Sequence, residues 1–295
     1  MAILPYSLHL DRIVAHIHVH PALSDASRIA VLFILHGHPA SAHHMKPIVG
    51  GTFDLAKNKA ALLEAKRNLV IVTFDLEDDS DFSNAVGELE YESTQLYNKQ
   101  GGPFWIFAYN QGANRNTPLI ERIASAVSEL IDTLPAVLCP NNDRFIDTWM
   151  VAGLSLGAHA AWLSMDRDPR LSVCIPIIGS PDFLEIATAR NNLTGLPLVS
   201  SYMTSVTRNH ILKNDPVSCR RNSLRPDPFM NKHILALAGA QDGMIPFTAT
   251  RQFLDRINVG PIGTKRLIIQ QGVGHQCTRE MVIEMAELVW AVALS

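Results

Sequence analysis

The segment Gly153-Leu154-Ser155-Leu156-Gly157 constrains the backbone more than any other part of this chain. An apolar run at 148–152 leads into it and small residues at 158–161 follow it, so the sequence predicts a strand, a sharp turn and a helix in that order. Glycine suits both flanking positions, because a Cβ two residues before or after the serine would collide with the neighbouring strand or helix. Ser155 is then expected at the carboxyl edge of a sheet. An ordinary glycine-rich turn would give the same pattern, so the rest of the sequence is needed to tell whether Ser155 has a functional role.

Two later strands end in polar residues of complementary chemistry. The run at 235–241 ends in Asp242, and a strand at 265–270 is followed by a short loop that ends in His275. Both side chains are expected at the same sheet edge as Ser155. A hydroxyl, an imidazole and a carboxylate gathered there would supply a nucleophile, its general base and the group that orients the base.

The chain order Ser155, Asp242, His275, with each residue at a strand end, resembles that of the α/β-hydrolase family. The resemblance extends over nearly the whole chain and implies that these three residues are catalytic. Asp75 and Asp182 also follow apolar runs and are rivals for the acid. Asp242 is preferred because its strand is the one that precedes the histidine strand. Taken singly, Asp242 could instead cap the following helix, and His275 could be an ordinary loop imidazole.

A second motif strengthens this resemblance. The apolar strand at 29–35 leads into His36-Gly37-His38-Pro39, which resembles the His-Gly-x-Pro oxyanion loop of the family. The resemblance implies an oxyanion hole formed by the backbone N–H groups of His38 and Leu156. The alternative is that the two histidines merely finish a buried strand and a turn.

The remaining pattern predicts an α/β-hydrolase fold, with a mainly parallel central sheet, helices on both faces and one domain over residues 1–295. We expect an antiparallel edge pair at 7–14 and 15–20, further strands at 29–35, 69–75, 148–153, 173–178, 234–238 and 266–270, and helices at 52–67, 117–134, 158–165, 247–257 and 278–294. The length of 295 residues and the apolar content of 47% are enough for one large core.

Two insertions interrupt the alternation, and each begins at the edge that carries Ser155. The first, 76–116, contains Trp105, Phe107 and Tyr109, and the second, 179–232, contains Tyr202. We expect these aromatic side chains to line a substrate pocket and 179–232 to form a cap or lid, as often occurs at this position in the family. The alternative for the aromatic group of the first insertion is packing of that insertion onto the core.

Composition excludes several other classes of protein. The net charge is −3, and no lysine or arginine cluster would follow nucleic-acid phosphates. The N-terminus lacks a secretion signal and no run approaches the roughly 20 apolar residues of a membrane span, so we expect a cytoplasmic protein without membrane contact. The four cysteines are scattered and are expected to be reduced thiols.

The histidines raise the alternative of a metal site, because His16, His18 and His20 alternate and would share one face of a strand. An exposed face of an edge strand explains the alternation without a metal, and no clear Cys or acidic ligand accompanies it. We therefore expect neither a metal nor another cofactor. His159, on the helix after Ser155, is expected to be a packing residue.

The predicted function is hydrolysis of a small-molecule carboxylic ester, thioester or lactone through an acyl-enzyme on Ser155. The segment 175–183 narrows the resemblance to small hydrolases related to prolyl oligopeptidases and dienelactone hydrolases. Dienelactone hydrolases use a cysteine nucleophile, so the serine esterases of that branch are the better comparison. Two alternatives remain open: a lyase or cyclase that uses the same residues for acid–base chemistry, and an inactive binding protein of the same fold.

Overall fold

Long apolar runs form the central strands of this protein, as its computed structural model shows. The structure describes residues 4–20, 26–37, 40–76, 118–194, 205–219 and 227–295. Three strands from the middle of the sheet, β3 (Arg28–Leu35), β4 (Asn68–Leu76) and β6 (Leu171–Ile177), are buried along almost their whole length. Strands buried on both faces are typical of a parallel sheet covered by helices.

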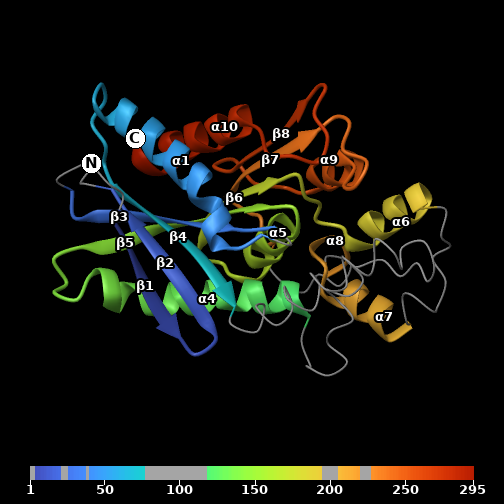
Figure 1. The fold of residues 1–295 in the computed structure, drawn as a ribbon, viewed down its shortest axis with the longest axis horizontal. Coiled ribbons are helices and arrows are strands. Elements are labelled where there is room, and N and C mark those ends of the chain that lie inside the picture. The colour runs from blue at the N-terminus through green and yellow to red at the C-terminus, as the bar shows by residue number, and fades with distance from the viewer. Residues whose placement is uncertain (1–3, 21–25, 38–39, 77–117, 195–204, 220–226) are drawn as a thin grey trace.

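Within the described residues, eight strands form one sheet in the order β1-β2-β4-β3-β5-β6-β7-β8 (Figure 1). The other strands are β1 (Leu4–Leu10), β2 (Ile13–Val19), β5 (Phe145–Leu154), β7 (His233–Gly239) and β8 (Thr264–Gln270). The pairs β1–β2 and β2–β4 are antiparallel, and all other neighbours are parallel. The mainly parallel sheet and its antiparallel edge pair are confirmed, although the turn at Asp11 falls inside the predicted first strand.

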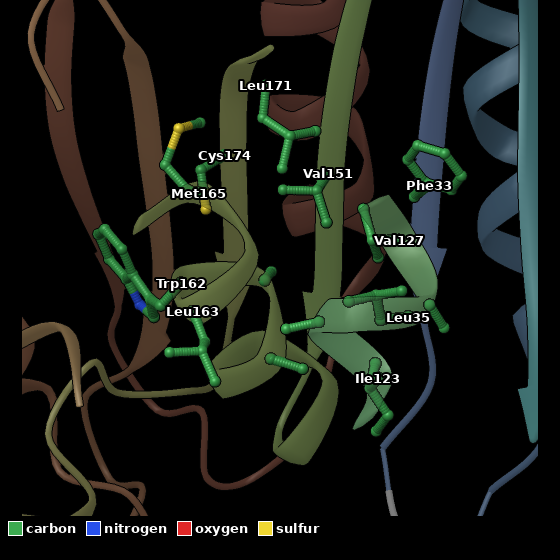
Figure 2. Packing of buried hydrophobic residues seen from close by; sticks show 14 of the residues in the cluster. Phe33, Leu35, Ile123, Val127, Val151, Trp162, Leu163, Met165, Leu171 and Cys174 are labelled. Carbon is green, nitrogen blue, oxygen red and sulfur yellow. The ribbon is translucent and has the colours of Figure 1, made fainter. Parts of the chain in front are cut away.

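Helices cover both faces of the sheet. They are α1 (Lys46–Ala60), α4 (Leu119–Leu138), α5 (Leu156–Arg167), α9 (Phe247–Arg256) and α10 (Arg279–Val289), which ends in a π-helical turn, Trp290–Leu294. Alternate residues of β3 belong to the two cores, since Phe33 packs in the cluster with α4 and α5, and Leu32 packs in the cluster with α1 and α10. Figure 1 shows α1 and α10 together on one side and α4 on the other, and Figure 2 shows Leu35 beside Ile123 and Val127 of α4.

The helix predicted at 52–67 is misplaced, because α1 begins at Lys46 and ends at Ala60. The prediction began it after Gly50 and Gly51, but both glycines lie inside the helix. Each glycine costs a helix interior roughly 0.5–1 kcal/mol relative to alanine. Packing explains Gly51, because a Cβ there would lie 3.1 Å from Cγ1 of Val282 on α10.

The described part of the insertion at 179–232 contains three helices that the sequence did not predict. They are α6 (Phe183–Thr194), α7 (Ser205–Asn214) and α8 (Pro216–Cys219), and they lie at one end of the molecule in Figure 1. His210 of α7 hydrogen bonds to the Glu121 carboxylate on α4, and Arg167 of α5 lies 3.1 Å from the other oxygen of that carboxylate. The insertion is therefore tied to the face that α4 and α5 cover. That it acts as a lid stays a prediction.

The membrane and cysteine predictions concern the chain as a whole. None of the helices in the described residues combines the length and the apolar character needed to cross a membrane. Cys139, Cys174 and Cys277 are free thiols, and the side chain of Cys219 lies outside the described residues.

The two glycines of α1 give a matched test of this packing. Gly50→Ala should raise the free energy of unfolding by about 0.4–1 kcal/mol, because a Cβ there meets nothing within 4 Å and alanine restricts the unfolded chain. Gly51→Ala should gain less or be destabilising, since its Cβ would press on Val282. Urea denaturation of both variants measures the difference. An equal gain at the two positions would contradict the packing explanation.

Candidate functional site

Ser155 lies on a strained turn between β5 and α5. Its φ of 51° and ψ of −111° are rarely adopted by a residue with a side chain, and such a conformation costs on the order of 1–3 kcal/mol. Backbone bonds hold the turn: the Ser155 N–H donates to the carbonyl of Ile177 at 3.0 Å, and its carbonyl accepts from Ala158 at 3.0 Å and His159 at 3.2 Å. The serine is thus fixed by β6 on one side and by the first turn of α5 on the other.

The two glycines beside this turn are required by crowding. A Cβ on Gly153 would lie 2.2 Å from the carbonyl oxygen of Gly157, at the start of α5. A Cβ on Gly157 would lie 2.5 Å from the carbonyl oxygens of Leu35 and His36, where β3 ends. The steric reason predicted from the sequence is therefore confirmed, and the turn brings the end of β3 directly against the start of α5.

Asp242 lies just beyond β7 with its carboxylate almost fully enclosed, since only 1% of the side chain is exposed. Its Oδ1 accepts hydrogen bonds from the backbone N–H groups of Met244 and Ile245, both at 2.9 Å. Its Oδ2 lies 2.8 Å from Nδ1 of His275. One oxygen is therefore fixed by the loop and the other is directed at the imidazole.

The loops that carry Asp242 and His275 are joined through their backbones. Ala240 N–H donates to the carbonyl of Gln270 at 2.8 Å, and Gln241 N–H donates to that of Val273 at 2.9 Å. A Cβ on Gly239 would lie 2.4 Å from the carbonyl oxygens of Val273 and Gly274. Glycine at 239 thus permits the close approach that brings the histidine loop over the acid.

His275 connects the carboxylate to the serine, because its Nε2 lies 3.0 Å from Oγ of Ser155. The imidazole side chain is 19% exposed, so solvent reaches the ring while Asp242 stays enclosed. With the proton of the neutral ring on Nδ1, toward Asp242, Nε2 is free to accept the serine proton. The structure therefore brings together all three residues that the sequence predicted, in the order carboxylate, imidazole, hydroxyl.

Both rival acids have other partners. Asp75 Oδ1 accepts the N–H of Ala42 at 2.8 Å and lies 3.3 Å from Nε2 of His36. Asp182 Oδ1 accepts the N–H of Glu185 at 3.0 Å and so caps the start of α6. Of these two and Asp242, it is Asp242 that contacts His275.

The predicted oxyanion donors are only partly described. Leu156 is the first residue of α5, so its N–H has no partner within the helix and is available to a ligand. His38 lies outside the described residues. Its neighbour Gly37 lies against the serine, because a Cβ on Gly37 would be 3.3 Å from the Ser155 Cβ.

A hollow with room for about one water molecule lies at the ends of β3 and β4. Its lining consists of Leu35, His36, Phe74, Leu76 and Ile123. The aromatic residues predicted to line a pocket are not among them, since Trp105, Phe107, Tyr109 and Tyr202 lie outside the described residues.

The expectation that the histidines of β2 line an exposed edge is wrong for His18. β2 lies between β1 and β4, and the His18 side chain is buried with Nε2 3.0 Å from Oγ1 of Thr73. Burial, together with nearby His16 and Lys46, lowers the pKa of His18 to about 4. Within the described ranges, no three His, Cys, Asp or Glu side chains are grouped to hold a metal ion.

His159, one turn after Ser155, belongs to a buried ion pair that the sequence did not predict. Its Nε2 lies 3.1 Å from Oδ1 of Asp215, between α7 and α8, and its Nδ1 lies 2.6 Å from the carbonyl of Ser180. The other oxygen of Asp215 accepts the N–H of Phe183 at 2.8 Å. Burial alone would lower the pKa of His159, but the Asp215 carboxylate and the Ser180 carbonyl outweigh it and raise this pKa above its usual value.

Comparison with known proteins gives likeness in structure alone. No protein-family model matches the chain, and no curated protein matches it in sequence. Among solved structures, TT1662 from Thermus thermophilus is 15% identical with a TM-score of 0.55, over 99% of this chain and 98% of that chain. The Pyrococcus furiosus esterase Pf2001 is 14% identical with a TM-score of 0.53, over 98% and 93%. The Pyrococcus horikoshii acylaminoacyl peptidase is 10% identical with a TM-score of 0.56, over 99% of this chain but 41% of that chain.

The His159–Asp215 pair predicts a pH-dependent stability. Because the folded-state pKa of His159 is raised above 6.5, the stabilisation from its protonation is fully present below about pH 6.5 and is lost as the pH rises through the folded-state value. Asp215→Asn should weaken or reverse this trend. The measurement is the free energy of unfolding in urea at about pH 5.5 and about pH 8.5.

Asp215→Asn also removes one negative charge, so a control variant should remove the charge of an exposed carboxylate. Asp132, whose side chain is 67% exposed, pairs with Arg170 on the surface. Asp132→Asn should therefore leave the pH trend of the wild type in place. If the free energy of unfolding changed with pH equally in the wild type and in Asp215→Asn, the buried pair would not control the pH dependence of stability.

Proposed function

We propose that this chain, which has the α/β-hydrolase fold, hydrolyses a carboxylic ester, thioester or lactone of a small molecule through an acyl-enzyme on Ser155. The observation that carries the proposal is the pair of hydrogen bonds in series, 2.8 Å from Asp242 to His275 and 3.0 Å from His275 to Ser155. A strained serine, an accessible imidazole and an enclosed carboxylate are the components that acyl transfer requires.

The chemistry runs in two steps. His275 Nε2 takes the proton of Ser155 as Oγ attacks the carbonyl carbon, and the imidazolium then gives this proton to the leaving alcohol or thiol as the bond to it breaks. Water, deprotonated by the same imidazole, attacks the carbonyl carbon of the acyl-enzyme. The imidazolium then returns the proton to Oγ of Ser155 as the bond between Oγ and the acyl group breaks, and the acid leaves. Asp242 keeps the imidazole in the required tautomer and stabilises its cation, and its two backbone hydrogen bonds keep the carboxylate in place.

The oxyanion formed in each step needs donors beside Ser155. We assign this role to the N–H of Leu156, which has no intrahelical partner, and to that of His38, which follows the glycine packed against the serine. Loss of one such donor typically raises the barrier by roughly 3 kcal/mol.

The proposed class of substrate is supported by the structural likeness. The likeness to an esterase over nearly the whole length of both chains agrees with an ester as substrate. Trp105, Phe107, Tyr109 and Tyr202 remain the proposed residues of the pocket.

A fluorophosphonate probe tests the proposal by intact-mass spectrometry. The wild type should gain one probe adduct, and Ser155→Ala none, because its nucleophile is absent. Asp242→Asn and His275→Ala should be labelled at least about a thousandfold more slowly, since both disrupt proton removal from Oγ. Ser164→Ala is the matched control, because Ser164 lies on α5 with its hydroxyl buried against the Ala160 carbonyl, and this variant should label like the wild type.

Other results of the probe experiment, or of a turnover assay, would favour one of the two alternative functions. Folded wild type that gains no adduct would contradict an activated serine and favour a binding protein. Turnover of a substrate that persists in Ser155→Ala would instead indicate acid–base chemistry by His275, as in a lyase or cyclase.

A further inference from the structure

Asp75 does not belong to the series of hydrogen bonds from Asp242 through His275 to Ser155. It holds both ends of the loop that follows β3. It lies near the end of β4, and its Oδ1 accepts the N–H of Ala42 at 2.8 Å and faces Nε2 of His36 at 3.3 Å. His36 begins the loop and Ala42 follows it. One carboxylate oxygen therefore bridges the two ends of a segment seven residues long.

Further contacts hold the bridge in place. His36 Nδ1 lies 2.9 Å from the carbonyl of Gly37, and the same carbonyl accepts the N–H of Ala40 at 3.0 Å. On the other side of the carboxylate, Nε2 of His16 lies 3.9 Å from Oδ2, and its Nδ1 lies 3.1 Å from Oγ of Ser7. The carboxylate thus connects β2 and β4 to the start of the loop.

The loop lies directly against the candidate nucleophile. A Cβ added to Gly37 would be 3.3 Å from Cβ of Ser155 and 3.0 Å from the carbonyl oxygen of Leu154. With so little space, a shift of Gly37 would displace the backbone beside Ser155. Misplacement of a catalytic group by about 1 Å can cost on the order of a hundredfold in rate.

We propose that Asp75 is a positioning residue for acyl transfer, which holds His36 and Ala42 in place and thereby keeps the backbone of Gly37 packed against Ser155, where the oxyanion would form. The inference rests on the proposed function, because an oxyanion is formed only in that chemistry. Asp75 would act on the transition state without contacting the substrate, so its loss should lower kcat and leave KM nearly unchanged.

Steady-state hydrolysis of p-nitrophenyl acetate tests this split. Asp75→Ala should lower kcat by about ten- to a hundredfold while KM changes by less than about twofold. Asp75→Asn keeps an oxygen acceptor for Ala42 and should retain kcat to within about threefold. A kcat of Asp75→Asn close to that of the wild type would show that the hydrogen bond to Ala42, and not the negative charge of Asp75, supports turnover.

Asp147→Ala is the matched control. Asp147 is also a partly buried carboxylate, but it binds Arg28 and Arg67 near the opposite end of β5 from Ser155. If Asp147→Ala folds, its kcat should equal that of the wild type. If Asp147→Ala does not fold, the comparison of Asp75→Ala with Asp75→Asn tests the proposal instead. Folded Asp75→Ala with wild-type kcat, or an equal loss in folded Asp147→Ala, would overturn the proposal.

Amide hydrogen exchange gives a readout that does not depend on turnover. Without the carboxylate, the N–H of Ala42 should exchange at least about tenfold faster in Asp75→Ala, while amides in the core of β5 stay protected. Unchanged exchange at Ala42 would overturn the proposal even in an active enzyme. If the wild type neither hydrolyses esters nor reacts with the probe, the proposed function fails, and the Ala42 exchange still decides whether Asp75 holds the loop.

Discussion

The strained backbone at Ser155 is the constraint on which the rest of this structure depends. A serine at φ 51° persists only where its surroundings leave no better conformation, and here β6, α5 and the end of β3 close around it. Gly153 and Gly157 leave the space that these elements fill, and the nearby carbonyl oxygens would collide with any larger residue. Large cores on both faces of the sheet supply the stability that offsets the strain.

Histidine–aspartate pairs stabilise the segments that meet at this serine, and their environments give them different chemistry. His275 is partly open to solvent while Asp242 is enclosed, and the imidazole of His275 reaches Oγ of Ser155. His159 is enclosed with Asp215, both its nitrogens face oxygens, and no lone pair remains for a substrate proton. Similar pairs therefore differ in their contacts: the imidazole of His275 faces a serine hydroxyl, whereas that of His159 joins α5 to the residue that follows α7.

Local pattern predicted most of the fold and the three residues that meet at the candidate site. Ser155, Asp242 and His275 each follow an apolar strand closely, so short sequence windows were enough to find them. Asp215 could not be found in this way, because its partner His159 lies 56 residues away and no local feature marks the contact. The start of α1 was missed for a related reason, since the need for Gly51 arises from Val282 on a distant helix.

The same long-range contacts determine how the insertion joins the core. Asp215 follows α7 and binds His159 on α5, one turn from Ser155, while His210 on α7 bonds to Glu121 on α4. Removing one partner of an enclosed ion pair leaves a buried charge unpaired, which typically costs on the order of 3–5 kcal/mol. Motion of α7 away from α5 would carry a similar penalty unless both groups regained water. The attachment therefore favours a structure in which α7 stays in place beside α4 and α5.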